Sequence, residues 1–193
     1  MATILKTHNT LIWLYNSIHF FKNHFLIITG LRLIAAFGRS VQLGAFGQVS
    51  SVANIILEII VEFARILIFL YVLGLSSLKK GLLRIEGLFT KKNNLRLNWN
   101  IAVRNMKTQW FPIAINITAF SIIALGINYV INFITYKTNL FLKLQTGGII
   151  SKSTSEWVLL LFFKNITVIP FTLIFCTIFF LWITNKFKIH KYQ

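Results

Sequence analysis

Long runs of apolar residues dominate the chain, and their lengths predict membrane-spanning helices. Three runs are strongly apolar, at residues 52–75, 111–135 and 157–184. A weaker run at 25–47 precedes them and is interrupted by two arginines. A helix needs about 20 mainly apolar residues to cross the roughly 30 Å hydrocarbon layer of a bilayer. The pattern therefore predicts an all-α fold: a single membrane domain, a polytopic integral membrane helix bundle with about four transmembrane helices.

The weaker run at 25–47 has two readings, a fourth span or a helix lying flat in the membrane interface. An interfacial helix has a strongly charged face and low overall hydrophobicity, whereas this run holds mostly apolar and small residues. Its glycines would let a neighbouring helix approach closely, as in many membrane helix pairs. We therefore expect a span. With only three spans, the N-terminus would lie on the opposite side of the membrane.

Residues 1–24 form a less apolar segment that is broken by Asn, His and Lys residues. A cleaved signal peptide fits poorly, because the basic start has only Lys6 and no small-residue cleavage site follows. We expect an uncleaved amphipathic N-terminal helix at the membrane surface. Trp13 and Tyr15 would then sit at the interface, where aromatic side chains are enriched.

Composition separates the chain from soluble classes of protein. Of 193 residues, 56% are hydrophobic and 12% are charged, with 20 Lys+Arg against 4 Asp+Glu and a formal net charge of +16. Soluble domains carry about 25% charged residues, and a disordered basic tail lacks this apolar content. Strong positive charge is also typical of nucleic-acid binders. No recognised nucleic-acid module is present and the cations border the spans, so nucleic acid is not an expected partner.

Positive charge is divided unevenly between the connecting segments, and this asymmetry predicts the orientation. The connector at 76–110 carries eight Lys and Arg residues against one Glu, whereas the connector at 136–156 carries three Lys residues. Loops rich in Lys and Arg stay on the cytoplasmic side. We therefore expect 76–110 inside, 136–156 outside and both termini in the cytoplasm, with the bacterial cytoplasmic (inner) membrane as the location.

The basic connector at 76–110 predicts contacts at the membrane surface. A short basic amphipathic helix is expected from about residue 96 to 109. Each cation gains about 1 kcal/mol against an anionic leaflet. Two readings stay open, contact with anionic lipid headgroups or docking of a cytoplasmic partner such as an ATPase. The candidate contact residues are Lys79, Lys80, Lys91, Lys92, Arg96, Arg104 and Lys107.

Charged residues inside the first two predicted spans form a candidate cluster: Arg32, Arg39, Glu58, Glu62 and Arg65. The last three share one helical face, because they are four and three residues apart. In an antiparallel hairpin that turns near residues 49–50, Arg39 comes level with residue 60. We therefore expect Arg39 to pair with Glu58 and Glu62, and Arg65 to pair with Glu62. No partner for Arg32 follows from the sequence, so it would snorkel or meet an acidic group of another subunit.

The cluster has a functional and a structural interpretation. Ionisable residues inside a membrane often mark a substrate or ion path, and a glutamate with a raised pKa can relay protons. Alternatively, the ions lock the hairpin or hold a partner subunit. Because no second acidic span exists to continue a relay, the structural interpretation is slightly favoured.

Two further features lie in the last two predicted spans. A polar stripe follows helical spacing along 111–135, and its members are Thr118, Ser121, Asn128, Asn132 and Thr135. Such a stripe is typical of interhelical hydrogen bonding, and less often of a permeation surface. Pro170 falls inside 157–184 and predicts a kink near Ile166, because proline removes one helical hydrogen bond.

No catalytic or cofactor chemistry follows from the sequence. Cys176 is alone, and His19 and His24 have no acidic companion, so no metal site and no cofactor are expected. No carboxylate pair suits general acid–base catalysis. We therefore expect a non-enzymatic multi-pass protein, an accessory or structural subunit of a membrane complex. The alternative is a small oligomeric transporter or channel that uses the Glu/Arg cluster, and its partner would be a self-oligomer rather than another membrane protein subunit.

Overall fold

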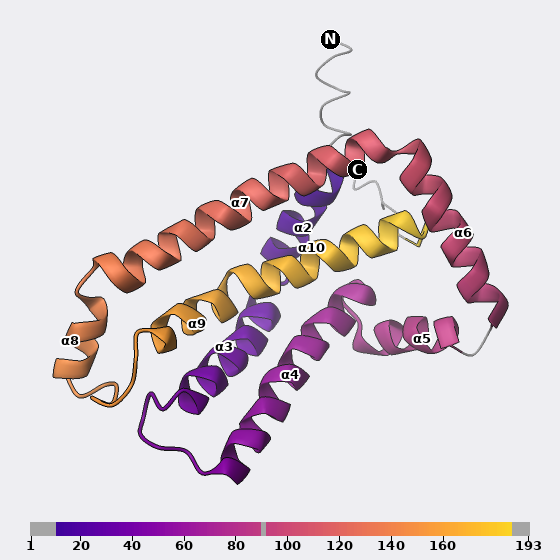
Figure 1. Cartoon of the computed structure of the whole chain (residues 1–193). Coiled ribbons are helices and arrows are strands. Elements are labelled where there is room, and N and C mark those ends of the chain that lie inside the picture. The colour runs from indigo at the N-terminus through magenta and orange to yellow at the C-terminus, as the bar shows by residue number, and fades with distance from the viewer. Residues whose placement is uncertain (1–10, 90–91, 187–193) are drawn as a thin grey trace. The chain divides into compact units, whose positions relative to one another are not determined.

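The computed structural model describes residues 11–89 and 92–186, and these ranges are helical without a strand (Figure 1). The all-α prediction is confirmed. Three helical stretches are long and apolar enough to cross a membrane: Phe25–Gln42, Trp110–Lys137 and Trp157–Ile183. The helices are α2 (Ile12–Asn23), α3 (Phe25–Gln42), α4 (Ser51–Leu73), α5 (Leu78–Phe89), α6 (Lys92–Thr108), α7 (Trp110–Lys137), α8 (Leu140–Thr146), α9 (Trp157–Ile166) and α10 (Val168–Ile183).

Three of the four expected spans are long and apolar enough to cross a membrane, and one is not. The weaker run at 25–47 meets the requirement, although its helix α3 ends at Gln42. The run at 52–75 forms the continuous helix α4 but is not among the three apolar stretches. Its charged residues lie near the middle of the helix, so every stretch of α4 long enough to cross includes them. A crossing by α4 therefore depends on how those charges are neutralised.

The helices belong to two compact units. Of the described residues, unit 1 comprises 11–24, 69–89, 92–122 and 173–186, and unit 2 comprises 25–68 and 123–172. Helices α4, α7 and α10 each continue from one unit into the other along the chain.

Close packing of α3 against its neighbours organises unit 2. Helix α3 lies along α9 (Figure 1), and its buried Ala35 packs with Val61 and Ala64 of α4. A methyl group at Gly38 would lie 2.7 Å from Cγ2 of Val61. Small residues thus bring α3 and α4 together, as the sequence pattern predicted.

Gly38 and Gly30 give a matched test of that close approach. We expect Gly38→Ala to lower the free energy of unfolding by about 1–3 kcal/mol, because the new methyl group overpacks against Val61. Gly30→Ala is expected to leave stability unchanged or to raise it slightly, since no atom lies within 4 Å of its added methyl and Ala favours the helix. Unfolding by SDS in mixed micelles measures both. Equal effects at the two positions would contradict the packing.

Aromatic packing at the end of α2 organises unit 1. Trp13 is 1% exposed, and its ring lies 4.3 Å from Trp182 and 5.1 Å from Phe179, centroid to centroid. The backbone N–H of Leu14 donates to Oδ1 of Asn116 on α7 at 3.2 Å. The expectation that Trp13 anchors a surface helix is therefore wrong, because its indole is needed to fill the space beside α10. Tyr15 is exposed, as an interfacial residue would be.

The connector at 76–110 holds two helices in unit 1 instead of the one that we expected. Helix α5 packs against α6, and the Arg84 guanidinium donates to the carbonyl of Leu73. Helix α6 begins earlier than expected, at Lys92, and ends at Thr108. Its Asn105 side chain donates to the carbonyl of Ile183 at 2.8 Å and to Oδ1 of Asn185 at 3.1 Å. These bonds fix α6 to the end of α10.

His24 joins the end of α2 to α4 in unit 1, and this contact should depend on pH. Its Nδ1 lies 3.1 Å from the Tyr71 hydroxyl, and burial lowers the pKa of His24 from its ordinary value of 6.5. Folding therefore favours the neutral ring, so the contribution to stability is complete above pH 6.5 and declines as the pH falls through the lowered pKa. We expect a ¹³C NMR titration of His24 in the folded chain to have its midpoint below that of a peptide with the same local sequence. A higher midpoint would contradict this sign.

Candidate functional site

The charge cluster lies within unit 2, and its first ion pair joins α3 to α4. Two guanidinium nitrogens of Arg39 contact the two carboxylate oxygens of Glu58, at 2.8 and 3.1 Å. The Gln42 side-chain amide also donates to Glu58, at 2.9 Å, and to the carbonyl of Asn54, at 3.0 Å. A two-pronged arginine–carboxylate contact is the strongest form of this pair and fixes its geometry. The pairing expected from the hairpin register is confirmed.

Glu62 extends the cluster along α4 and toward α9. It contacts Arg39 at 3.7 Å and also pairs with Arg65, three residues further along the helix. Arg65 in turn donates to Oδ1 of Asn165 on α9 at 2.8 Å. The side-chain amide of Asn165 donates to the carbonyl of Leu161 at 2.8 Å. Both expected pairs of Glu62 are present, and a continuous series of polar contacts crosses α3, α4 and α9.

Arg32 has partners that the sequence did not indicate. The helix is interrupted at Thr167, between α9 and α10, close to the kink expected from Pro170. Because Pro170 has no N–H, the carbonyl of Ile166 lacks its normal helical donor. Arg32 supplies one at 3.0 Å and also donates to Oγ1 of Thr29 at 2.8 Å. Its side chain is 8% exposed, so Arg32 is a buried cation at the end of α9 rather than a snorkelling one.

Exposure divides the cluster into an inner and an outer part. The side chains of Arg39 and Arg65 are 22% and 21% exposed, whereas those of Glu58 and Glu62 are 47% and 46% exposed. Two carboxylates near the middle of a helix are thus open on the side away from their arginines. Arg39 and Arg65 both contact the same oxygen of Glu62, Oε1, within the described part of the chain. Because the Glu62 side chain is 46% exposed, its carboxylate can accept a further hydrogen bond from an outside donor.

All five residues of the predicted polar stripe lie on α7. Thr118, Ser121 and Asn132 are exposed, and the Asn128 amide donates to the carbonyl of Ala124 within the same helix at 2.9 Å. Thr135 is 1% exposed. The stripe therefore remains a prediction, since the recorded bond of Asn128 stays inside one helix.

The predicted surface cations occupy the two connector helices. Lys79 and Lys80 are exposed on α5, and Arg96, Arg104 and Lys107 are exposed on α6. Lys91 lies outside the described residues, and so does the side chain of Lys92. Cations on α6 border a surface hollow of about 460 Å³, which Trp99 also lines.

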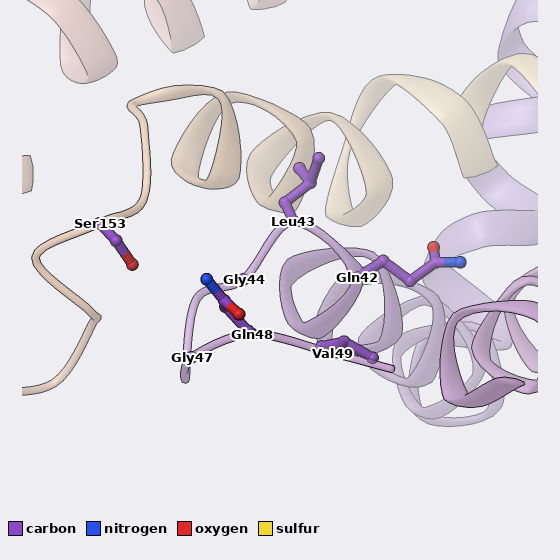
Figure 2. A pocket seen from close by; sticks show the side chains of 7 residues that line it. All are labelled: Gln42, Leu43, Gly44, Gly47, Gln48, Val49 and Ser153. Atoms are coloured by element: carbon purple, nitrogen blue, oxygen red, sulfur yellow. The ribbon is translucent and has the colours of Figure 1, made fainter. Parts of the chain in front are cut away.

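A second hollow, of about 370 Å³, lies in unit 2 where two loops meet. Figure 2 shows the loop after α3, with its two glycines, on one side and Ser153 on the other. Gly44 and Gly47 have φ angles of +76° and +117°, which favour glycine. The hollow is lined by amide, hydroxyl, glycine and apolar residues without a charged side chain: Gln42, Leu43, Gly44, Gly47, Gln48, Val49 and Ser153. Gln42 is the lining residue that also contacts the charge cluster, through its hydrogen bond to Glu58.

Three residues that make these polar contacts were not predicted from the sequence to do so. Gln42 and Asn165 take part in the cluster, and Asn116 is fully buried between α2 and α7, with its amide bound to the carbonyl of Pro112. Asn116 and Asn165 both begin Asn-x-Thr triplets inside apolar runs. An amide within a predicted span was the available signal, because such a group needs a hydrogen-bond partner there.

Comparison with protein-family models, curated protein sequences and solved structures finds no match to this chain.

Proposed function

We propose that the chain is a non-enzymatic accessory or structural subunit of a membrane complex, and that a helix of another subunit covers α4 at Glu58 and Glu62. The observation that carries this proposal is the half-exposure of both carboxylates in a membrane protein. A charged side chain at the centre of a bilayer costs about 2.5–3.5 kcal/mol on insertion scales. Pairing with Arg39 and Arg65 lowers that cost on one side only, so the open side requires polar cover.

The chemistry of the open side defines what the partner helix presents. The half-exposed carboxylate of Glu62 accepts a hydrogen bond on its open side, so the partner contributes an N–H or O–H donor such as Ser, Asn or Lys. Exposed Ile55 and Ile59 flank the carboxylates on α4, and apolar side chains of the partner pack on them. One polar contact within an apolar surface fixes the register of two membrane helices.

Co-purification tests the proposal. A tagged chain extracted in mild detergent is expected to retain one or more unlike membrane proteins, and Glu62→Gln is expected to reduce their recovery while the chain itself stays abundant. Glu156→Gln is the matched control, because Glu156 lies outside the helices at the start of α9. If both variants retain the same partners as the unmodified chain, the α4 surface does not hold them.

A small oligomeric transporter or channel is the second candidate, and one observation favours it. Broken helices often line ion and substrate sites in transporters, and here Arg65 and Arg32 both contact the last turn of α9, beside the interruption at Thr167. A transporter would purify as a self-oligomer and move solute in liposomes, with activity lost in Glu62→Gln at normal abundance. That outcome would replace the subunit proposal.

We further propose that the chain lies in the bacterial cytoplasmic membrane with its 76–110 connector inside. The excess of cations in that connector supports this orientation, and the bond from Asn105 to Ile183 supports a common side for α6 and the end of α10. In a Cys176→Ser background, Lys80→Cys is expected to react with a membrane-impermeant thiol reagent only after the cells are opened. Labelling in intact cells would show that the connector faces the outside, opposite to the proposed orientation.

A further inference from the structure

Helix α6 lies at the level where two membrane helices end. Its last residue, Thr108, is two residues before Trp110, where the apolar stretch of α7 begins. Its Asn105 is bonded to Ile183, the last residue of the apolar stretch that α10 completes. Both attachments belong to unit 1. Because the ends of spanning helices mark the bilayer surface, the last turn of α6 is held there.

An apolar face and basic residues adjoin on the exposed sides of α6, and the exposed Leu97 lies on the basic side. Leu95, Trp99 and Met106 are 46%, 70% and 53% exposed and lie four and seven residues apart, on one helical face. The adjoining face carries the exposed cations Arg96, Arg104 and Lys107. An amphipathic helix with aromatic and aliphatic residues beside cations is typical of binding in the membrane interface.

The α6 hollow lies where these two faces meet. Its volume is about 460 Å³, and its lining is Trp99, Asn100, Val103, Arg104, Lys107 and Thr108. Arginine and lysine together offer charge-assisted hydrogen bonds to phosphate oxygens, and Asn100 and Thr108 add neutral polar groups. Apolar Trp99 and Val103 on the same wall suit the glycerol backbone and the start of an acyl chain.

We infer that the α6 hollow is a binding site for an anionic phospholipid, with the phosphate between Arg104 and Lys107 and the acyl chains along Trp99 and Met106. A free phosphate would leave the exposed apolar face in water, whereas a lipid covers both faces at once. The last turn of α6 lies at the bilayer surface, which is the level of the phospholipid headgroups. This site is on α6 in unit 1 and does not depend on the α4 surface.

Native mass spectrometry of the purified full chain tests the site with defined lipids. The unmodified chain is expected to retain phosphatidylglycerol in preference to phosphatidylcholine. The double variant Arg104→Gln/Lys107→Gln is expected to bind phosphatidylglycerol roughly thirtyfold more weakly, at about fivefold for each cation lost. The control Lys79→Gln/Lys80→Gln removes the same charge from exposed positions on α5 and is expected to change binding little.

Several results would overturn the inference. Equal losses in the two double variants would mean that diffuse charge attracts the lipid, without a site on α6. Displacement of phosphatidylglycerol by similar concentrations of inorganic phosphate would assign the hollow to a free anion. Unchanged phosphatidylglycerol binding, together with loss of a soluble partner from native membranes, would assign the same cations to protein docking.

Trp99→Ala gives a second measurement that keeps both cations. It is expected to weaken phosphatidylglycerol binding while leaving any binding of inorganic phosphate unchanged, because only the lipid contacts the apolar wall. The swapped variant Arg104→Lys/Lys107→Arg keeps the charge and is expected to retain the lipid. Loss of lipid in the swapped variant, with the helical circular dichroism unchanged, would contradict a site based on charge.

Discussion

Arg39→Gln is expected to destabilise the chain more than any other substitution, by about 2–3 kcal/mol, because Glu58 is half exposed and loses two charge-assisted hydrogen bonds. The substitution removes both donors that hold the two oxygens of Glu58 and the contact to Oε1 of Glu62. Among the described residues, Glu58 would keep the hydrogen bond from the amide of Gln42 but would lose the cation that pairs with it directly. The loss should appear as a lower free energy of unfolding in SDS titrations and as lower abundance in membranes.

A double-mutant cycle separates the ion pair from general damage at position 39. Glu58→Gln in the Arg39→Gln background is expected to recover most of the lost stability, because two neutral amides can hydrogen bond without leaving an unpaired charge. Arg39→Lys keeps the charge but lacks the planar two-pronged geometry, so an intermediate loss is expected. If the effects of Arg39→Gln and Glu58→Gln simply add, the two side chains do not stabilise each other.

Arg32→Met is also expected to have a large effect, about 1–3 kcal/mol, because it leaves the carbonyl of Ile166 without a donor. Methionine fills a similar volume, so the loss reports mainly on the hydrogen bonds. The same substitution in a Pro170→Ala background is expected to cost much less. Alanine restores an N–H at position 170, and that N–H can bond to the Ile166 carbonyl as in a continuous helix.

The comparison between the two backgrounds is the measurement that decides the role of Arg32. Unfolding free energies of the four chains form a cycle, and a coupling near zero would show that Arg32 stabilises something other than the helix interruption. Thr29→Val serves as a control for the second bond of Arg32, and its effect should be equal in both backgrounds.

Periodicity and register were sufficient to predict one part of the cluster. Helical spacing places Glu62 and Arg65 on one face, and the length of the hairpin places Arg39 opposite the two glutamates. These are local relations between adjacent helices, and a short connection limits the possible alignments. The close approach at Gly38 follows from the same pattern of small residues.

Contacts between distant segments could not be predicted in the same way. The sequence suggested that Pro170 disturbs the last span, but only the packing of α3 on α9 brings Arg32 to the freed carbonyl. Trp13 looked like an interfacial anchor because the sequence does not say that Trp182 and Phe179 lie beside it. Helix α5 was missed because its short amphipathic sequence resembles a loop with mixed polarity.

The guanidinium of Arg32 also determines how the interruption after α9 responds to the surrounding electrolyte. A helix C-terminus carries partial negative charge, and exposed carbonyls at such ends can recruit mobile ions. Here a cation is attached to the chain itself, 3.0 Å from the Ile166 carbonyl. Because the guanidinium is part of the chain, its position beside the carbonyl does not depend on dissolved ions. The conformation at Thr167 should therefore be the same in sodium, potassium or choline buffers at any ionic strength.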